Sequence, residues 1–180
     1  GMLEKAREIF EQILMRDIVS WNAMISGYAQ LGDTDMVSKL FRKMSIKGFR
    51  PNPVTFLALL MAYSHGGLLN EGEKLFNDMC IVFHFVPTLE HYTCLMDLFC
   101  RAGHFDEAKF FLGKVDSSHY LSLLLVFMGA CAKWGNVNLG RWAFEQSLQL
   151  DETCGAAYIC MEKIYARACT ERETPNIECD

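Results

Sequence analysis

Four glycines divide this chain into segments of similar length, and their spacing constrains the fold more than any other feature. They occupy positions 32, 67, 103 and 135 of the 180 residues, so the steps between them are 35, 36 and 32. A series of smaller residues keeps the same steps: Val37, Gly72, Ala108 and Gly140. A series of large apolar residues keeps them as well and continues by a further 34: Trp21, Phe56, Tyr92, Leu124 and Tyr158. Because three landmarks share one varying register, we expect tandem repeats.

Each repeat has the pattern of two short helices. Residues 18–32 carry apolar side chains at helical spacing up to Gly32, and a second apolar stripe between residues 36 and 44 precedes Gly48 and Pro51. One such hairpin cannot bury its apolar faces alone, so it needs neighbours. The expected fold class is therefore all-α, an α-solenoid of tandem antiparallel helix-turn-helix repeats wound into a right-handed superhelix.

The landmarks also set the expected boundaries. Residues 1–17 form the second helix of an incomplete repeat, so the chain is expected to be a piece of a longer protein. The remaining segments are complete repeats at 18–52, 53–88 and 89–120, a further repeat-like unit at 121–154, a partial repeat at 155–169 and a disordered tail at 170–180. The tail lacks a closing helix, and Cys169 stands where a closing glycine is expected.

Composition excludes several classes of function. The formal net charge of −5 argues against a nonspecific nucleic-acid clamp, and no apolar run is long enough to predict a membrane span. The eight cysteines form no CxxC pair and lie mostly among apolar helix residues, which is typical of reduced intracellular thiols. No phosphate loop, metal-ligand cluster or acid–base pair is evident. We therefore expect no enzymatic activity, no catalytic residue, no cofactor and no bound metal.

Several stretches resemble one known family. SWNAMISGYAQLG, VTFLALLMAYSHGGLLNEGEKLF and EHYTCLMDLFCRAGHFDEA are similar to the pentatricopeptide repeats of plants. The lengths and order resemble the subclass that alternates standard (P), long (L) and short (S) repeats, with a short repeat ending at residue 17, a P repeat at 18–52, an L repeat at 53–88 and an S repeat at 89–120. MGACAKWGNVNLGRWAFEQSLQLD and GAAYICMEKIYA resemble the E-type extension that follows the last repeats in such proteins.

The resemblance implies a function. Members of this family recognise single-stranded RNA in chloroplasts or mitochondria, one nucleotide per repeat. Members with the E-type extension usually select cytidines for C-to-U editing. By resemblance, the chain is a non-catalytic RNA recognition module for editing or related RNA processing. Residues 121–168 would engage an editing deaminase or an accessory protein. The zinc deaminase signature of His-x-Glu with Cys-x-x-Cys is absent from the sequence.

The resemblance also implies which residues contact RNA. In the family, the second residue of a repeat packs on the base, and the fifth and last residues bind its edge. In the P repeat these are Val19, Asn22 and Asn52, and a pair of asparagines resembles the family's pyrimidine-preferring combination, with cytosine favoured over uracil. An amide can both donate to and accept from a pyrimidine edge.

The other repeats offer a weaker set of contacts. The corresponding residues are Val54, Leu57 and Thr88 in the L repeat, Thr93 and Tyr120 in the S repeat (His119 if its boundary slips) and Asp17 at the end of the incomplete repeat. Leucine has no hydrogen-bonding group, and the family's reading pairs usually end in Asp or Asn. The first helices at 18–32 and 53–67 carry no charged residue, so little phosphate attraction is expected. We therefore expect weak, salt-sensitive binding.

Alternative interpretations exist for each signal. Asn22 can be read as an ordinary polar residue on an exposed helix face, and the apolar run 123–128 as core. The rival function is a helical-repeat scaffold for protein–protein interaction. Both ends of the stack are expected to expose unpaired faces, through which the chain can self-associate.

Overall fold

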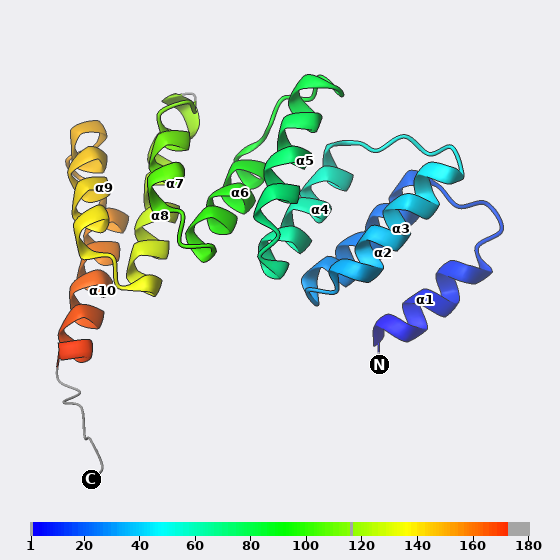
Figure 1. The fold of residues 1–180 in the computed structure, drawn as a ribbon, viewed down its shortest axis with the longest axis horizontal. Coiled ribbons are helices and arrows are strands. Elements are labelled where there is room, and N and C mark those ends of the chain that lie inside the picture. The colour runs from blue at the N-terminus through cyan, green and yellow to red at the C-terminus, as the bar shows by residue number, and fades with distance from the viewer. Residues whose placement is uncertain (1, 116, 173–180) are drawn as a thin grey trace, which may run out of the picture. The chain divides into compact units, whose positions relative to one another are not determined.

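The computed structural model describes residues 2–115 and 117–172, and all regular elements in these ranges are α-helices (Figure 1). The ten helices are α1 (Met2–Gln12), α2 (Ile18–Gln30), α3 (Thr34–Ile46), α4 (Pro53–Gly66), α5 (Leu69–Ile81), α6 (Leu89–Arg101), α7 (Phe105–Leu112), α8 (Ser117–Trp134), α9 (Val137–Leu150) and α10 (Gly155–Arg172). The predicted all-α class is confirmed. None of the described helices is long and apolar enough to cross a membrane.

The helices form two compact units, one up to Leu98 and one from Phe99 onwards. In the first unit, α2 packs against α1, α3 and α4, and α4 packs against α3 and α5. In the second unit, α8 packs against α7, α9 and α10, and α9 also packs against α10. In each unit, a first helix thus packs against the second helix of its own hairpin and against the first helix of the next repeat, as α2 does with α3 and α4 and α8 does with α9 and α10.

The four landmark glycines mark the ends of first helices, as the sequence predicts. They follow α2, α4, α6 and α8, with φ angles of 72°, 66°, 80° and 69°. Glycine adopts this left-handed conformation without a Cβ clash, so the chain can leave the helix there. At Cys169 the glycine is missing, and α10 continues to Arg172. The expected end of the helical region at residue 169 is therefore too early; the rest of the predicted tail, residues 173–180, lies outside the described residues.

Aromatic and aliphatic side chains from the first helices fill the core. Trp21 is fully buried, and its ring packs edge-on against Phe10 with the centroids 4.9 Å apart. In the second unit, Leu123, Phe127 and Met128 are fully buried. The apolar run 123–128 thus contributes chiefly to the core, which was one of its two interpretations.

The small-residue positions allow the helices to approach closely. A Cβ added at Gly140 of α9 would lie 2.5 Å from Ile164 Cδ1 on α10 and 3.4 Å from Cys131 Cβ on α8. Ile164 and Cys131 are themselves fully buried, so neither can swing into solvent. The recurrence of small residues in the sequence is therefore a packing requirement.

We predict opposite effects of the same substitution at two helical glycines. Gly140→Ala overpacks the α8–α9–α10 contact at a cost of about 1–3 kcal/mol, which exceeds the gain in helix propensity. Gly129→Ala, on the exposed face of α8 with no atom within 4 Å of the new Cβ, should stabilise by about 0.5–1 kcal/mol. Urea unfolding of both variants measures the difference; equal stability of the two would contradict the packing argument.

Candidate functional site

The last residues of two predicted repeats are helix N-caps. Asp17 Oδ1 accepts a hydrogen bond from the Ser20 backbone N–H at 2.8 Å, and Asn52 Oδ1 accepts one from the Thr55 N–H at 3.0 Å. The Asp17 and Asn52 backbone N–H groups donate in return to the hydroxyls of Ser20 and Thr55, each at 3.1 Å. These reciprocal capping boxes satisfy backbone donors that have no partner inside the helix. The predicted base-contacting residue is thus held in place by helix formation itself.

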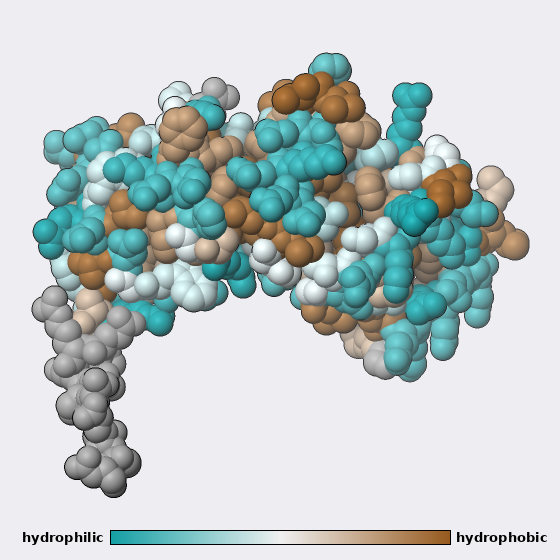
Figure 2. Space-filling model, viewed as in Figure 1, coloured by the Kyte–Doolittle hydropathy of each residue, from teal (hydrophilic) through white to brown (hydrophobic). Residues whose placement is uncertain are grey.

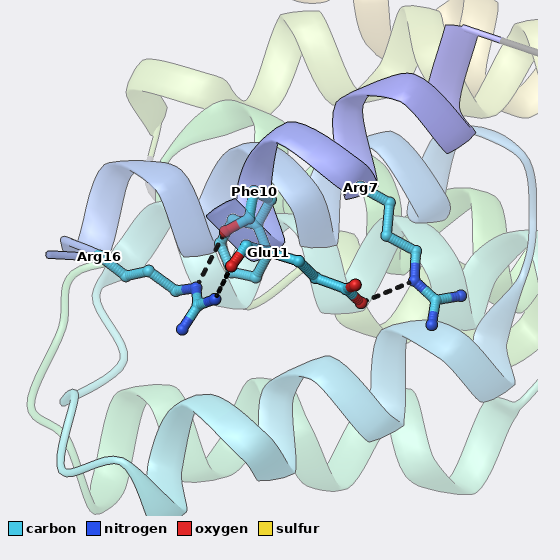
Figure 3. Close-up of polar contacts among 4 residues, drawn as sticks. All are labelled: Arg7, Phe10, Glu11 and Arg16. Carbon is cyan, nitrogen blue, oxygen red and sulfur yellow. Dashed lines mark hydrogen bonds and ion pairs between the residues drawn. The ribbon is translucent and has the colours of Figure 1, made fainter. Parts of the chain in front are cut away.

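The loop before Asp17 is also fixed. Arg16 reaches back to the end of α1, where Nε donates to the Phe10 carbonyl at 3.0 Å and Nη2 to the Glu11 carbonyl at 2.8 Å (Figure 3). Its guanidinium lies 5.0 Å from the centroid of the Phe10 ring. The exposed Arg7–Glu11 pair at 3.1 Å contributes little beside this, because solvent screens it. Arg16 ties α1 to the start of α2, a role that the repeat pattern does not reveal.

The structure brings Asn22 and Asn52 together. Asn22 Nδ2 donates to Asn52 Oδ1 at 2.9 Å, which joins the fifth residue of the P repeat to its last residue. The Thr55 hydroxyl donates to Asn22 Oδ1 at 2.7 Å and lies 3.0 Å from Asn52 Oδ1. Asn22 is 6% exposed, Thr55 is fully buried and Asn52 is half-buried. The interpretation of Asn22 as an exposed polar residue is therefore wrong; it belongs to a three-residue network between α2 and the start of α4.

Thr55 was not among the candidate residues from sequence. The sequence does contain a pattern that points to Thr55. A hydroxyl residue three positions after Asn52 completes a capping box with the Asn52 amide. That signal predicts a helix start and gives no indication of the contact with Asn22, which is 33 positions away.

The L repeat does not form an equivalent pair. Thr88 precedes α6, and its backbone N–H donates to His91 Nδ1 at 3.2 Å. His91 Nε2 lies 2.9 Å from the Pro53 carbonyl oxygen, which can only accept, so Nε2 carries the proton and Nδ1 is an acceptor. Leu57, the fifth residue, is half-buried and offers no hydrogen bond to Thr88. His91 follows Thr88 by three positions, as Thr55 follows Asn52. At this boundary, however, no asparagine side chain is present to form the amide pair.

The two polar candidates of the S repeat differ in setting. The Thr93 hydroxyl donates to the Leu89 carbonyl of its own helix at 2.8 Å. Tyr120 lies inside α8 rather than directly before a helix, and so does the alternative residue His119. Tyr120 lines a surface cavity of about 430 Å³ together with residues of α7, of the turn that follows it and of α9: Asp106, Lys109, Phe110, Gly113, Lys114 and Trp142. Tyr120, the expected last residue of the S repeat, therefore does not cap the next helix as Asp17 and Asn52 do.

The second-position valines are exposed. Val19 is 68% exposed and Val54 is 52% exposed, and they lie in the first turns of α2 and α4. Their neighbours Trp21 and Phe56 are buried. An apolar side chain held in solvent at the start of each helix can pack on a planar ligand next to the amide network.

The titratable groups give no sign of chemistry. Burial raises the pKa of Cys94 to about 11 and that of Cys131 to about 12, so both thiols are protonated at neutral pH and poor nucleophiles. The cysteines in the described ranges are free, and no group of three metal-binding side chains occurs there. Hydrogen bonds from the Ser20 backbone and hydroxyl lower the pKa of Asp17.

This arrangement defines a helical-repeat protein in which the last residue of one repeat caps the first helix of the next. The model of the PPR repeat family matches residues 16–65, and that of the PPR repeat matches residues 54–80 and 90–118. These matches cover more than half of the chain, which therefore belongs to the pentatricopeptide repeat family.

Similar proteins agree with this assignment. A chloroplastic pentatricopeptide repeat-containing protein of Arabidopsis thaliana is 38% identical over 168 residues, covering 93% of this chain and 20% of the relative. A mitochondrial one is 36% identical over 166 residues, covering 92% of this chain and 36% of the relative. The chain thus spans between about a fifth and a third of the length of these relatives.

Two crystal structures share the fold. One is of the pentatricopeptide repeat protein PPR10 in complex with an 18-nucleotide psaJ RNA element, with a TM-score of 0.77, 20% identity, and coverage of 93% of this chain and 25% of that chain. The other is of PPR10 from maize, with a TM-score of 0.66, 19% identity, and coverage of 97% and 28%. At these identities the likeness concerns the fold alone, and it confirms the predicted class of α-solenoid.

The Asp17 cap makes the stability of α2 sensitive to acid. The pKa of Asp17 is lower in the folded chain than its ordinary value of 3.8. Its stabilising contribution is therefore present above that value and is lost as the pH falls through the lowered pKa. We predict that Asp17→Asn, which keeps an N-cap without a titrating group, loses less Tm than the wild type between neutral pH and about pH 3. An equal fall in Tm with decreasing pH for the two proteins would contradict this.

Proposed function

We propose that the chain is a non-catalytic recognition module for single-stranded RNA. The observation that carries this proposal is the Asn22–Asn52 pair, in which the fifth and last residues of the P repeat meet at 2.9 Å, together with the exposed valines Val19 and Val54 in the first turns of α2 and α4. Amides bind the edges of unstacked bases, and an apolar side chain packs on their faces. The PPR10 complex with RNA supports the same ligand class for this fold.

Because the chain offers a single amide pair, we expect its affinity for RNA to be modest. The helices that carry the site have no charged residue at 18–30 or 53–64, and the chain has a net charge of −5. Few phosphate contacts are then available, so the affinity of this piece is modest, and added salt weakens it further by screening those contacts. Further repeats in a longer protein would add binding energy at neighbouring nucleotides.

The relatives and the repeat order support a biological setting for this function. The relatives named chloroplastic and mitochondrial support an organellar protein. The order of P, L and S repeats, followed by an E-type extension at 121–154, supports a role in selecting cytidines for C-to-U editing or related RNA processing. In this proposal the deaminase acts in trans and is recruited through residues 121–168.

A protein partner is the second candidate function, and two features of the surface favour it. The cavity beside Tyr120 is lined by aromatic rings, with Lys109 Nζ 4.2 Å from the centroid of the Trp142 ring. An apolar cluster also lies where α5 ends (Figure 2). Its exposed members are Ile81, Val82, Phe83 and Val86. A chain that acts only as a scaffold would retain no single-stranded RNA at low salt.

The RNA proposal predicts the effect of removing either amide. Asn22→Ala and Asn52→Ala should each weaken binding of pyrimidine-rich RNA about fivefold to tenfold, since each removes at least one hydrogen bond to a base. Fluorescence anisotropy with labelled single strands at about 50 mM salt measures this, with double-stranded RNA as a negative control. Asn77→Ala, an exposed asparagine on α5, is the matched control and should bind like the wild type.

The result that would contradict the proposal is equal affinity for all three variants, with far-UV circular dichroism showing that each is folded. Flat binding curves for the wild type would contradict RNA recognition by this piece altogether.

A further inference from the structure

The positive charge of the first unit gathers in one stretch of the chain. Between Asp35 and Glu71 the sequence has no acidic residue but five lysines and arginines, although the whole chain has a net charge of −5. All five are exposed: Lys39, Arg42, Lys43, Lys47 and Arg50. The second helix of the P repeat and the loop after it therefore carry a local excess of positive charge.

Three of these cations lie at the C-terminal end of α3. Lys43 is in the last turn of the helix, Lys47 is its C-cap, and Arg50 lies in the loop to α4, two residues before Asn52. Lys43 and Lys47 are four residues apart, which places them on one side of the helix, about 6 Å from each other along its axis. The three residues thus lead along the chain towards the amide pair.

The loop that carries Arg50 is held against α2. The Phe49 backbone N–H donates to the Met44 carbonyl at 3.2 Å, and the Phe49 ring packs against the Trp21 ring with the centroids 6.1 Å apart. Trp21 directly precedes Asn22 in α2. Because α2 and α3 form an antiparallel hairpin (Figure 1), the end of α3 lies beside the start of α2. The three cations therefore lie at the same end of the hairpin as the amide pair.

The protein itself does not neutralise these cations. Within the described part of the chain, Lys43, Lys47 and Arg50 form no hydrogen bond or ion pair. Glu11 lines a surface cavity together with Lys43, but the Glu11 carboxylate pairs with Arg7 at 3.1 Å. The three charged groups are therefore available to an anionic ligand.

The arginine at the preceding repeat boundary has a different setting. Arg16 directly precedes Asp17, and its guanidinium donates to the carbonyls of Phe10 and Glu11. Those bonds give Arg16 a structural role. Arg50 makes no such contact in the described residues, so holding the loop in place does not account for it.

We propose that Lys43, Lys47 and Arg50 bind backbone phosphates of the RNA strand next to the base that contacts the amide pair. The inference rests on the proposed RNA function. Phosphate contacts position a strand without reading its sequence, and positively charged grooves follow the backbone of single strands. Since α2 and α4 contain no lysine or arginine, they cannot supply these contacts themselves. The end of α3 supplies them, while Asn22 and Asn52 contact the base.

Stabilisation of the helix is the competing explanation, because cations near a helix C-terminus interact favourably with the helix dipole. The chain offers a matched control. Lys133 is an exposed lysine in the last turn of α8, and Lys74 is an exposed lysine on α5. Replacing both by glutamine changes the net charge by the same amount as replacing Lys43 and Lys47.

The test follows the Kd for oligocytidine by fluorescence anisotropy between about 50 and 200 mM salt. For a single strand, log Kd rises with log salt concentration with a slope of about 0.7 for each phosphate contact. We expect the double variant Lys43→Gln/Lys47→Gln to lower this slope by about 1.4 and Arg50→Gln to lower it by about 0.7. Glutamine has a helix propensity close to that of lysine, so the variants should stay folded, which far-UV circular dichroism checks.

Two controls accompany these variants. Lys74→Gln/Lys133→Gln should keep the wild-type slope. Asn22→Ala should weaken binding at every salt concentration and also keep the slope, because it removes a base contact and no phosphate contact. Oligoglutamate with the same number of charges as the RNA serves as a competitor and should displace it poorly.

The outcomes separate this inference from the proposed function. A wild-type slope in the folded Lys43→Gln/Lys47→Gln variant overturns the inference while RNA recognition stands. An equal fall in Lys74→Gln/Lys133→Gln also overturns it, because net charge then explains both. Displacement by oligoglutamate as efficient as by unlabelled oligocytidine overturns it too, since the cations then favour an acidic protein segment as much as RNA. A wild-type chain that binds no RNA overturns the proposed function, and the inference falls with it.

Discussion

The need of every helix start for hydrogen-bond acceptors is the constraint on which the rest of this structure depends. The first N–H groups of α2 and α4 have no partners within their helices, and Asp17 and Asn52 supply them. The same residues end the preceding repeats, so each cap also lies at a boundary between repeats. At Asn52 this places a polar side chain within reach of Asn22 on α2. Folding and the proposed recognition therefore use one side chain.

Packing between the helical hairpins holds α2 and α4 in the positions that bring Asn22 and Asn52 together. Trp21 is fully buried directly beside Asn22 in the sequence, and Phe56 is buried directly after Thr55. These large side chains fix the rotation of α2 and α4 about their axes, because turning either helix would expose an aromatic ring. The fifth residue of one repeat then faces the cap of the next. In the second unit, Gly140 lets α9 approach α8 and α10 closely.

The sequence predicted the parts of the fold that depend on local chemistry. The closing glycines adopt positive φ because only glycine does so easily, and their spacing alone located the ends of the first helices. The resemblance to the family named Asn22 and Asn52 together as base-contacting residues, and their side chains are hydrogen-bonded to each other in the structure. Two features escaped prediction: α10 runs past Cys169, where no glycine ends the helix, and the Thr55 hydroxyl makes a tertiary hydrogen bond to Asn22. Tyr120 differs for a third reason, since α8 begins at Ser117 and the repeat boundary drawn from length fell inside it.

In the proposed complex the side-chain amides of Asn22 and Asn52 contact the base, and nuclear magnetic resonance observes these groups directly. The measurement is a titration of the ¹⁵N-labelled chain with oligocytidine, following the side-chain amide resonances assigned through Asn22→Ala and Asn52→Ala. We expect the side-chain amide resonances of Asn22 and Asn52 to shift as RNA is added and to reach saturation at the same RNA concentration as binding does. The side-chain amide resonances of Asn77 should not shift. RNA binding that leaves the Asn22 and Asn52 amides unchanged would contradict it.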